Sequence, residues 1–489
     1  MGQGTAIAIA LLLSGCAVGP DFHPPAAPAT SGYAPGELPQ STAATGVVGG
    51  ETQRFRSGAD LPGQWWTLFG SAALDQLITQ AMANYPDIAA QQAALRQSRE
   101  NVRAEAGVFL PTLTGTGLAD RNKSSGASIA PGFPAFITDI FEANVNVSYT
   151  LDLWGAERRT LEGLKAQAEA QNFQLEASYL TLTSNVAAAA IQLAATRDLL
   201  DATQQIIQLE EKQLSVIQRR VQLGSQTSAD VLQQQSNLAQ VRASLPPLQQ
   251  QLAVSAHQLA VLTGQFPHDA TAPDLKLADL KLPQDLPVSL PSALVAQRPD
   301  IRAQAALMHQ ASAAVGVATA NMLPQLTLTG SFGGESLRFA SLLEPGSNAW
   351  SIAGQISQPL FEGGALNAKR RAARAAFDEA SAQYKLTVLT AFQNVADTLT
   401  ALDNDAQALS AQFAALNAAQ ASLDLIQRQY DIGTANYVTL LAAQQSYQQT
   451  RLAYVRALAT RYTDTVTLFQ ALGGGWWHRQ DPGTLPVPK

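Results

Sequence analysis

The chain has 489 residues and a formal net charge of −7, which argues against a protein that binds nucleic acid. Only 14% of its residues are charged, well below the rough quarter of typical soluble domains, so part of its surface is expected to face something other than bulk water. No apolar run reaches the length of about eighteen residues that a transmembrane helix needs. A membrane role would therefore have to use strands.

The first residues carry the pattern of an export signal. Residues 5–13 are apolar but too few to span a membrane, and Leu13-Ser14-Gly15-Cys16 follows, so residues 1–15 are predicted to be a signal peptide. The Leu-Ser-Gly-Cys ending resembles the lipobox of bacterial lipoproteins, which implies lipidation of Cys16; the alternative is a buried free thiol. Ala17, in place of Asp, favours the outer membrane. Without a second cysteine, no intramolecular disulfide can form.

The remaining chain contains an internal duplication. Pro86 recurs as Pro299 and Gly224 recurs as Gly433, shifts of 213 and 209 residues. The predicted divisions are an extended N-terminal segment at 16–73, repeat 1 at 74–264, a linker rich in Pro and Leu at 265–291, repeat 2 at 292–473, and a tail at 474–489.

Each repeat is predicted to contain the same elements in the same order. A helix begins at Pro86 or Pro299, where proline is favourable in the first turn, and two strands follow it. The strands are expected at Leu113–Arg121, Phe141–Leu153, Leu326–Phe332 and Trp350–Leu360. Long helices follow at Ala156–Leu223 and Ala365–Ile432. Return helices are expected at Ser228–Thr263, interrupted at Pro246-Pro247, and at Tyr437–Leu472.

Both long helices repeat an apolar residue every seven positions, which requires a packing partner and predicts a left-handed supercoil. The first ladder is Val186, Leu193, Leu200, Ile207, Leu214 and Val221; the second is Val395, Leu402, Leu409, Leu416, Leu423 and Tyr430. The fold class is therefore mainly α, with two strands and a pair of long coiled-coil helices in each repeat.

The segment at 141–152 alternates strictly between polar and apolar residues, which indicates a strand with two different faces. The polar set, predicted to face water in a barrel lumen, is Asn144, Asn146, Ser148 and Thr150. The apolar set, predicted to face lipid, is Val145, Val147 and Tyr149, with Trp350 and Ile352 in repeat 2.

Four strands cannot close a barrel, and in lipid only a closed barrel satisfies every strand hydrogen bond. Three chains would supply about twelve strands and leave room for a channel. A strand of a soluble sandwich is the alternative interpretation. Tyr149, Phe332 and Trp350 could form an aromatic girdle or ordinary core packing.

Five motifs in order resemble the outer-membrane factor family of TolC-like proteins, in the lipoprotein branch that serves resistance–nodulation–division efflux systems. They are Cys16–Phe22, Trp65–Phe69, Leu151–Gly155, Gln358–Gly364 and Ala471–Trp476. The resemblance implies an outer-membrane homotrimer, with a twelve-stranded β-barrel on a twelve-helix periplasmic α-barrel. It also implies a periplasmic adaptor protein and an inner-membrane pump as partners.

The resemblance places a gate beside the glycines that end the long helices, Gly224 and Gly433. Tyr430 and Asp230 match family gate positions, whereas Thr439 stands where the family often has a carboxylate, which weakens the case for cation selection. Tyr430 could instead be the last rung of the ladder, and Asp230 could charge the first turn of a return helix.

Two basic clusters follow the strands, Arg158-Arg159 and Lys369-Arg370-Arg371. They could face anionic lipid headgroups, but solvated helix faces are the favoured interpretation.

No chemistry is predicted. The five histidines (His23, His257, His268, His309 and His478) lack metal-ligand spacing, and no phosphate-binding loop or nucleophile motif occurs, so no enzyme and no cofactor are expected. The leading function is a passive outlet for small molecules. The alternatives are a type I secretion outlet and a structural lipoprotein without a pore, with an enzyme a distant third.

Overall fold

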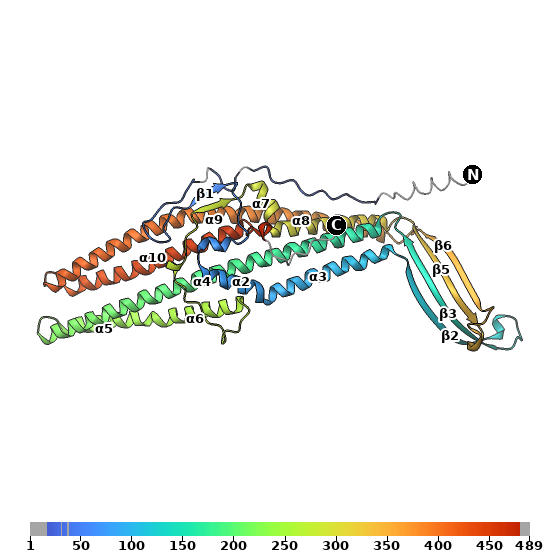
Figure 1. The fold of residues 1–489 in the computed structure, drawn as a ribbon, viewed down its shortest axis with the longest axis horizontal. Coiled ribbons are helices and arrows are strands. Elements are labelled where there is room, and N and C mark those ends of the chain that lie inside the picture. The colour runs from blue at the N-terminus through green and yellow to red at the C-terminus, as the bar shows by residue number, and fades with distance from the viewer. Residues whose placement is uncertain (1–16, 31, 37–38, 480–489) are drawn as a thin grey trace. The chain divides into compact units, whose positions relative to one another are not determined.

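A computed structural model describes residues 17–30, 32–36 and 39–479 (Figure 1). The predicted signal peptide and the lipidation site Cys16 lie outside this range. The chain divides into two units: unit 1 holds the residues up to 25 with 94–172 and 303–385, and unit 2 holds 26–93, 173–302 and the chain from 386 on. Among the described residues, none of the helices combines the length and hydropathy that crossing a bilayer would need.

Unit 1 contains one antiparallel sheet of four strands in the order β2-β3-β5-β6 (Figure 1). The strands are β2 Thr112–Ser124, β3 Phe136–Leu151, β5 Gln325–Ser336 and β6 Asn348–Ser357. All four predicted strands are present, and the hairpins of the two repeats meet through β3 and β5.

β3 and β6 end earlier than the sequence indicates. The Asp152 carboxylate accepts hydrogen bonds from the backbone N–H groups of Glu157 (3.2 Å) and Arg158 (3.1 Å), so Asp152 belongs to the turn that starts the next helix. Beyond β6, Pro359 has no N–H to donate to a strand partner.

The helices follow the predicted plan closely. They are α2 Ala72–Asn84, α3 Pro86–Ala106, α4 Ala156–Gln222, α5 Ser228–Ala243, α6 Leu245–Leu262, α7 Pro291–Gln297, α8 Pro299–Ala320, α9 Ala365–Asp431 and α10 Tyr437–Ala471. Both long helices, α4 and α9, have 67 residues, about 100 Å at 1.5 Å per residue. The return path of repeat 1 breaks at Ser244, because two prolines stand in the first turn of α6, whereas α10 is continuous.

Within unit 2, α5 and α6 run along α4, and α10 runs along α9 (Figure 1). The first three residues of each heptad ladder are buried. Val186, Leu193 and Leu200 of α4 are at most 7% exposed, and Val395, Leu402 and Leu409 of α9 are fully buried. The later rungs, except Tyr430, keep part of their surface exposed in the single chain.

The predicted linker does more than connect the repeats. Leu275, Leu277 and Leu280 are each 1% exposed, and β4 (Asp285–Val288) pairs in parallel with β1 (Arg54–Ser57) of the N-terminal segment. The Tyr462 hydroxyl of α10 donates to Leu280 O at 2.9 Å, and Phe469 of α10 packs on Trp65 and Phe69 of the N-terminal segment.

Candidate functional site

The register of the unit 1 sheet gathers the polar residues on one face. Asn146 lies opposite Thr114 on β2 and Ser331 on β5, and Ser331 lies opposite Ser351 on β6. Since directly opposed residues share a face, the predicted lumen residues Asn144, Asn146, Ser148 and Thr150 stand on one polar surface. Side-chain bonds cross it, such as Asn146 Nδ2 to Thr116 Oγ1 at 3.0 Å.

The other face of the same sheet is apolar and exposed. Val145 lies opposite Phe332, which lies opposite Trp350, and Val147 lies opposite Gly330, which lies opposite Ile352. Trp350 is 71% exposed and Ile352 is 82% exposed. The predicted lipid-facing residues, Tyr149 included, therefore share one surface, and a run of exposed apolar side chains on one face is typical of a surface that contacts a partner or a membrane.

The sheet also has two open edges. β2 and β6 stand at its ends, and no other strand among the described residues pairs with either of them. Unpaired strand edges offer N–H and C=O groups to another chain.

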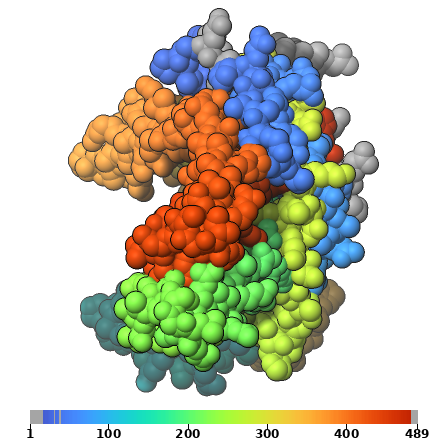
Figure 2. Space-filling model, turned by 90° about the vertical axis from the view of Figure 1, so that its left-hand side faces the viewer, coloured from blue at the N-terminus to red at the C-terminus, as the bar shows by residue number. Residues whose placement is uncertain are grey.

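The predicted gate residues lie in unit 2, around the two turns that end the long helices. Each turn has five residues, 223–227 after α4 and 432–436 after α9. Gly224 and Gly433 have φ of +76° and +82°, the left-handed conformation that glycine adopts without strain at a helix end. Figure 2 shows the two turns on one face, the first in green and the second in orange-red.

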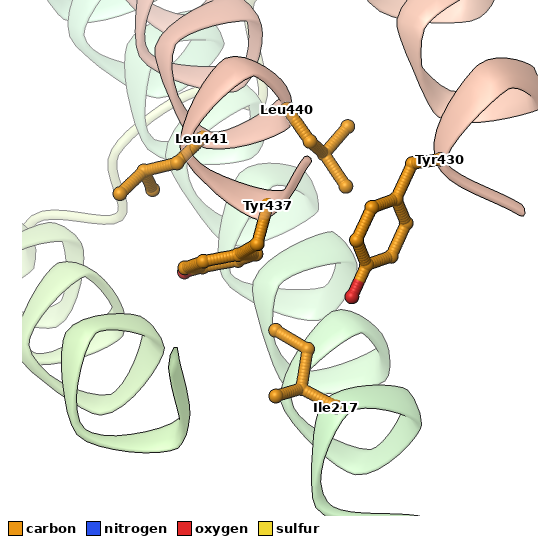
Figure 3. Close-up of a cluster of buried hydrophobic side chains, with 5 residues drawn as sticks. All are labelled: Ile217, Tyr430, Tyr437, Leu440 and Leu441. Carbon is orange, nitrogen blue, oxygen red and sulfur yellow. The ribbon is translucent and has the colours of Figure 1, made fainter. Parts of the chain in front are cut away.

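Tyr430 is packed beside these turns. It is 1% exposed and lies with Tyr437, Leu440 and Leu441 of α10 and Ile217 of α4 (Figure 3). Burial, the largest cause, raises the pKa of the Tyr430 hydroxyl. The structure thus brings Tyr430 into a core that joins α4, α9 and α10, and this core includes the last rung of the ladder.

No pattern in the sequence pointed to Arg220 at the end of α4. Its guanidinium lies 4.4 Å from the centre of the Tyr430 ring, and its Nη1 donates to the Tyr430 carbonyl at 3.1 Å. Its Nη2 is 3.6 Å from Asp431 Oδ1. One side chain therefore holds the end of α9 against α4, and its charge suits the negative end of that helix.

Asp230 and Thr439 both lie in the first turn of a return helix and bond to its N-cap residue. Asp230 Oδ2 accepts hydrogen bonds from Thr227 N (3.0 Å) and Thr227 Oγ1 (2.8 Å), and Asp230 N donates to Thr227 Oγ1 (3.3 Å), which completes a capping box. The Thr439 N–H and hydroxyl both donate to Oδ1 of the Asn436 side chain, each at 2.9 Å. The spacing Thr227–Asp230 could have revealed the first cap from the sequence.

A layer of buried polar side chains lies next to the Tyr430 core in unit 2. Gln234 is fully buried; its amide donates to the Glu210 carboxylate, and its carbonyl oxygen accepts from the Tyr437 hydroxyl, each at 2.5 Å. Burial raises the pKa of Glu210, although the bonds from Gln234 and Asn237 oppose this shift. This layer gave no sequence signal, because isolated polar residues in a helix usually face solvent.

In the described part of the chain, no group of three or more His, Cys, Asp or Glu residues is placed to hold a metal ion. The arrangement is instead a two-faced sheet in one unit and a set of capped helical turns in the other.

Comparisons with known proteins agree with this arrangement. The profile of the family described as outer membrane efflux protein matches residues 77–265 and 290–474. The pyoverdine export outer membrane protein OpmQ of Pseudomonas aeruginosa is 31% identical over 429 residues, 86% of this chain and 89% of that protein.

Two further similarities extend over almost the whole chain. The toluene efflux pump outer membrane protein TtgF of Pseudomonas putida is 28% identical over 487 residues, 96% of each protein. The solved structure of the outer-membrane channel OprN superposes with a TM-score of 0.84 at 26% identity, covering 94% of this chain and 100% of that one. Since the profile covers both repeats and the relatives match nearly end to end, the chain belongs to the outer membrane efflux protein family, a family of export channels and not of enzymes.

Proposed function

We propose that this protein is the exit duct of a tripartite efflux pump, formed when three copies join their sheets into a twelve-stranded barrel on a twelve-helix periplasmic tunnel. The observation that carries this proposal is the unit 1 sheet, with its exposed apolar face, its polar face and its two open edges. Its strands have 13, 16, 12 and 10 residues, enough for the roughly 9–11 residues that cross a bilayer.

The number of copies in the assembly is inferred from the size of the pore that they would enclose. Two copies would give eight strands, a barrel that its own side chains fill, whereas three leave space for a channel. In such a barrel β2 of one copy would pair with β6 of the next, which removes both open edges. Asn144, Asn146, Ser148 and Thr150 would line the lumen. Val145, Val147, Tyr149, Trp350 and Ile352 would contact lipid.

The turns around Gly224 and Gly433 would form the narrow periplasmic end. Tyr430 is the better candidate for a gate residue, because movement of α9 must disturb its packing on α4 and α10. Asp230 and Thr439 would act on the gate through the helix caps that they form. With Thr439 in place of a carboxylate, strong cation selection at this end is not expected.

Partners and cargo are inferred from the family. A periplasmic adaptor and an inner-membrane pump would supply the energy, and an acyl chain on Cys16 would add an anchor in the outer membrane. The relatives named above are called exporters of pyoverdine and of toluene, which differ greatly in chemistry but are both small molecules. Because relatives of one family serve such different cargo, we assign the choice of substrate to the pump rather than to the duct.

Single-channel recording in planar bilayers tests the proposal. The purified protein should give discrete, long-lived openings, and its mass in detergent should correspond to three chains. A structural lipoprotein without a pore would give no openings. A type I secretion outlet would conduct as well, but deleting its gene would abolish export of a polypeptide and leave the retention of a small fluorescent efflux substrate unchanged.

A further inference from the structure

The residues directly after Cys16 lie in a site built from both repeats within unit 1. Val18 N donates to Trp154 O at 2.9 Å, in the turn between β3 and α4. Phe22 stacks on His309 of α8, with ring centres 4.4 Å apart and planes 10° apart. The segment Ala17–Phe22 therefore contacts an element of repeat 1 and an element of repeat 2.

Arg159 of α4 is the centre of this site. Its side chain is only 6% exposed, and its two terminal nitrogens each lie 2.8 Å from a carboxylate, Nη2 from Asp21 and Nη1 from Glu162. Its Nε also donates to Val18 O at 3.3 Å. The expectation that Arg158-Arg159 lies on a solvated helix face is wrong for Arg159, because its side chain is buried. A buried charge is stable only when it is paired, and the two carboxylates supply the pairing.

Glu162 extends the network from α4 to α8. Its second oxygen lies 2.8 Å from His309 Nε2, so the ring that stacks on Phe22 is fixed by a hydrogen bond. The bonds from Arg159 and His309 outweigh burial and lower the pKa of Glu162. Asp21, Arg159, Glu162 and His309 thus form one continuous chain of polar contacts.

Three glycines show how closely the segment approaches the helices and the turn. A Cβ on Gly19, whose φ is +106°, would lie 2.4 Å from the Gly316 Cα, and a Cβ on Gly316 would lie 2.8 Å from Arg159 Cγ and 3.1 Å from Val18 O. At the turn, a Cβ on Gly155 would lie 2.6 Å from the Ala17 Cβ. The backbone of the segment therefore fits only because glycine stands at these positions.

We propose that Ala17–Phe22 is a docking clip that fastens the start of the mature chain across repeats 1 and 2, directly beside the turn that joins β3 to α4, with Arg159 as its positioning residue. The consequence for the lipid depends on the lipidation of Cys16 that belongs to the proposed function. If Cys16 is acylated, the docked segment leaves no flexible linker between the acyl group and the fold. Because Ala17 already packs on Gly155, the lipid would enter the membrane at one fixed place beside the sheet, and α4 and α8 would be joined there.

Glycine-to-alanine substitution gives a sharp test. Gly316→Ala should favour the helix α8, since alanine is the better helix former, yet its methyl group occupies the space of Arg159 and Val18. Gly163→Ala on α4 is the matched control, because its Cβ would meet Ala313 Cβ at an ordinary 3.7 Å. Arg159→Met removes the central charge, and Lys165→Met removes a charge from an exposed position on the same helix.

Hydrogen exchange of the full-length protein in detergent, read at the Val18 amide, reports whether the clip is closed. Both Gly316→Ala and Arg159→Met should speed this exchange by about tenfold, the factor expected on losing one charge-assisted contact. The two controls should exchange like the parent, and amides within α8 should stay protected. Asp21→Asn, which changes a side chain that is 83% exposed, should speed exchange without any risk to the core.

The inference is overturned if the Val18 amide exchanges at the parental rate in these variants, or if the controls speed it equally. The mass of the N-terminal peptide separates this failure from that of the proposed function. If Cys16 carries no acyl group, the proposed lipid anchor is refuted, but the clip is not. If Cys16 is acylated but exchange of the Val18 amide is insensitive to all three variants, the clip is refuted and the lipid anchor is retained.

Discussion

Arg220→Met should loosen the turn that ends α9. The substitution removes the guanidinium stacked on Tyr430 at 4.4 Å, worth about 0.5–1 kcal/mol at a partly exposed site. It also removes the charged hydrogen bond to the Tyr430 carbonyl, worth about 1–1.5 kcal/mol. The contact with Asp431 adds little, because that carboxylate is 53% exposed.

These contributions sum to about 2 kcal/mol, which corresponds to a roughly thirtyfold rise in the population of the opened turn. Hydrogen exchange is the direct assay. The amides of Ile432, Gly433 and Thr434 bond to carbonyls in the last turn of α9, so their protection should fall by about that factor. In bilayer recordings the variant should also spend more time open.

Arg219→Met is the control, since Arg219 is the neighbouring exposed residue on α4 and its substitution removes the same charge. If protection at 432–434 changed by less than about twofold in Arg220→Met, Arg220 would not hold the turn. The same conclusion would follow if the two variants behaved alike, because a general charge effect would then explain the result.

Three further outcomes are expected. Ile352→Arg should destabilise the membrane-inserted protein by about 2–4 kcal/mol, while Ser351→Arg on the opposite face should cost far less; urea unfolding in lipid vesicles measures the difference, and equal losses would contradict the assignment of the faces. Asn146→Lys should shift the reversal potential of the channel toward anion selectivity in a salt gradient, and an unchanged potential would place Asn146 outside the lumen. Burial, and then the neighbouring Asp464, raise the pKa of Asp405 to about 7; the folded protein therefore holds this proton more tightly than the unfolded chain does, and stability falls as pH rises from about 4 to about 7. Asp405→Asn should leave the melting temperature unchanged near pH 4 and raise it at pH 8, and a variant that melts lower than the parent at pH 8 would show that the charge is not costly.

Local patterns account for most of what could be predicted. The alternation at 141–152 specifies a two-faced strand, and the prolines and glycines specify where the helices begin and end, because these residues restrict or permit backbone angles within a turn or two. The capping box of Asp230 was available from the same kind of local spacing.

Contacts between distant segments could not be predicted in this way. The pairing of β1 with β4 joins residues more than two hundred positions apart, such as Arg54 and Asp285, and the clip brings Asp21 to Arg159. Neither periodicity nor propensity says which strand edge or which helix face will be the partner. For the same reason, the burial of Arg159 and the stacking of Arg220 on Tyr430 had no sequence signal.

The sequence by itself determined two repeats, their strands and their 67-residue helices, since backbone preference and hydrophobic period act over a few neighbouring residues. Only the tertiary structure decided that polar residues of neighbouring strands, such as Asn146 and Ser331, share one face, that Tyr430 is buried among α4 and α10, and that Ala17–Phe22 docks beside the β3–α4 turn. Register and docking depend on the shape and charge of surfaces that exist only after the chain has folded, and these surfaces combine residues from both repeats.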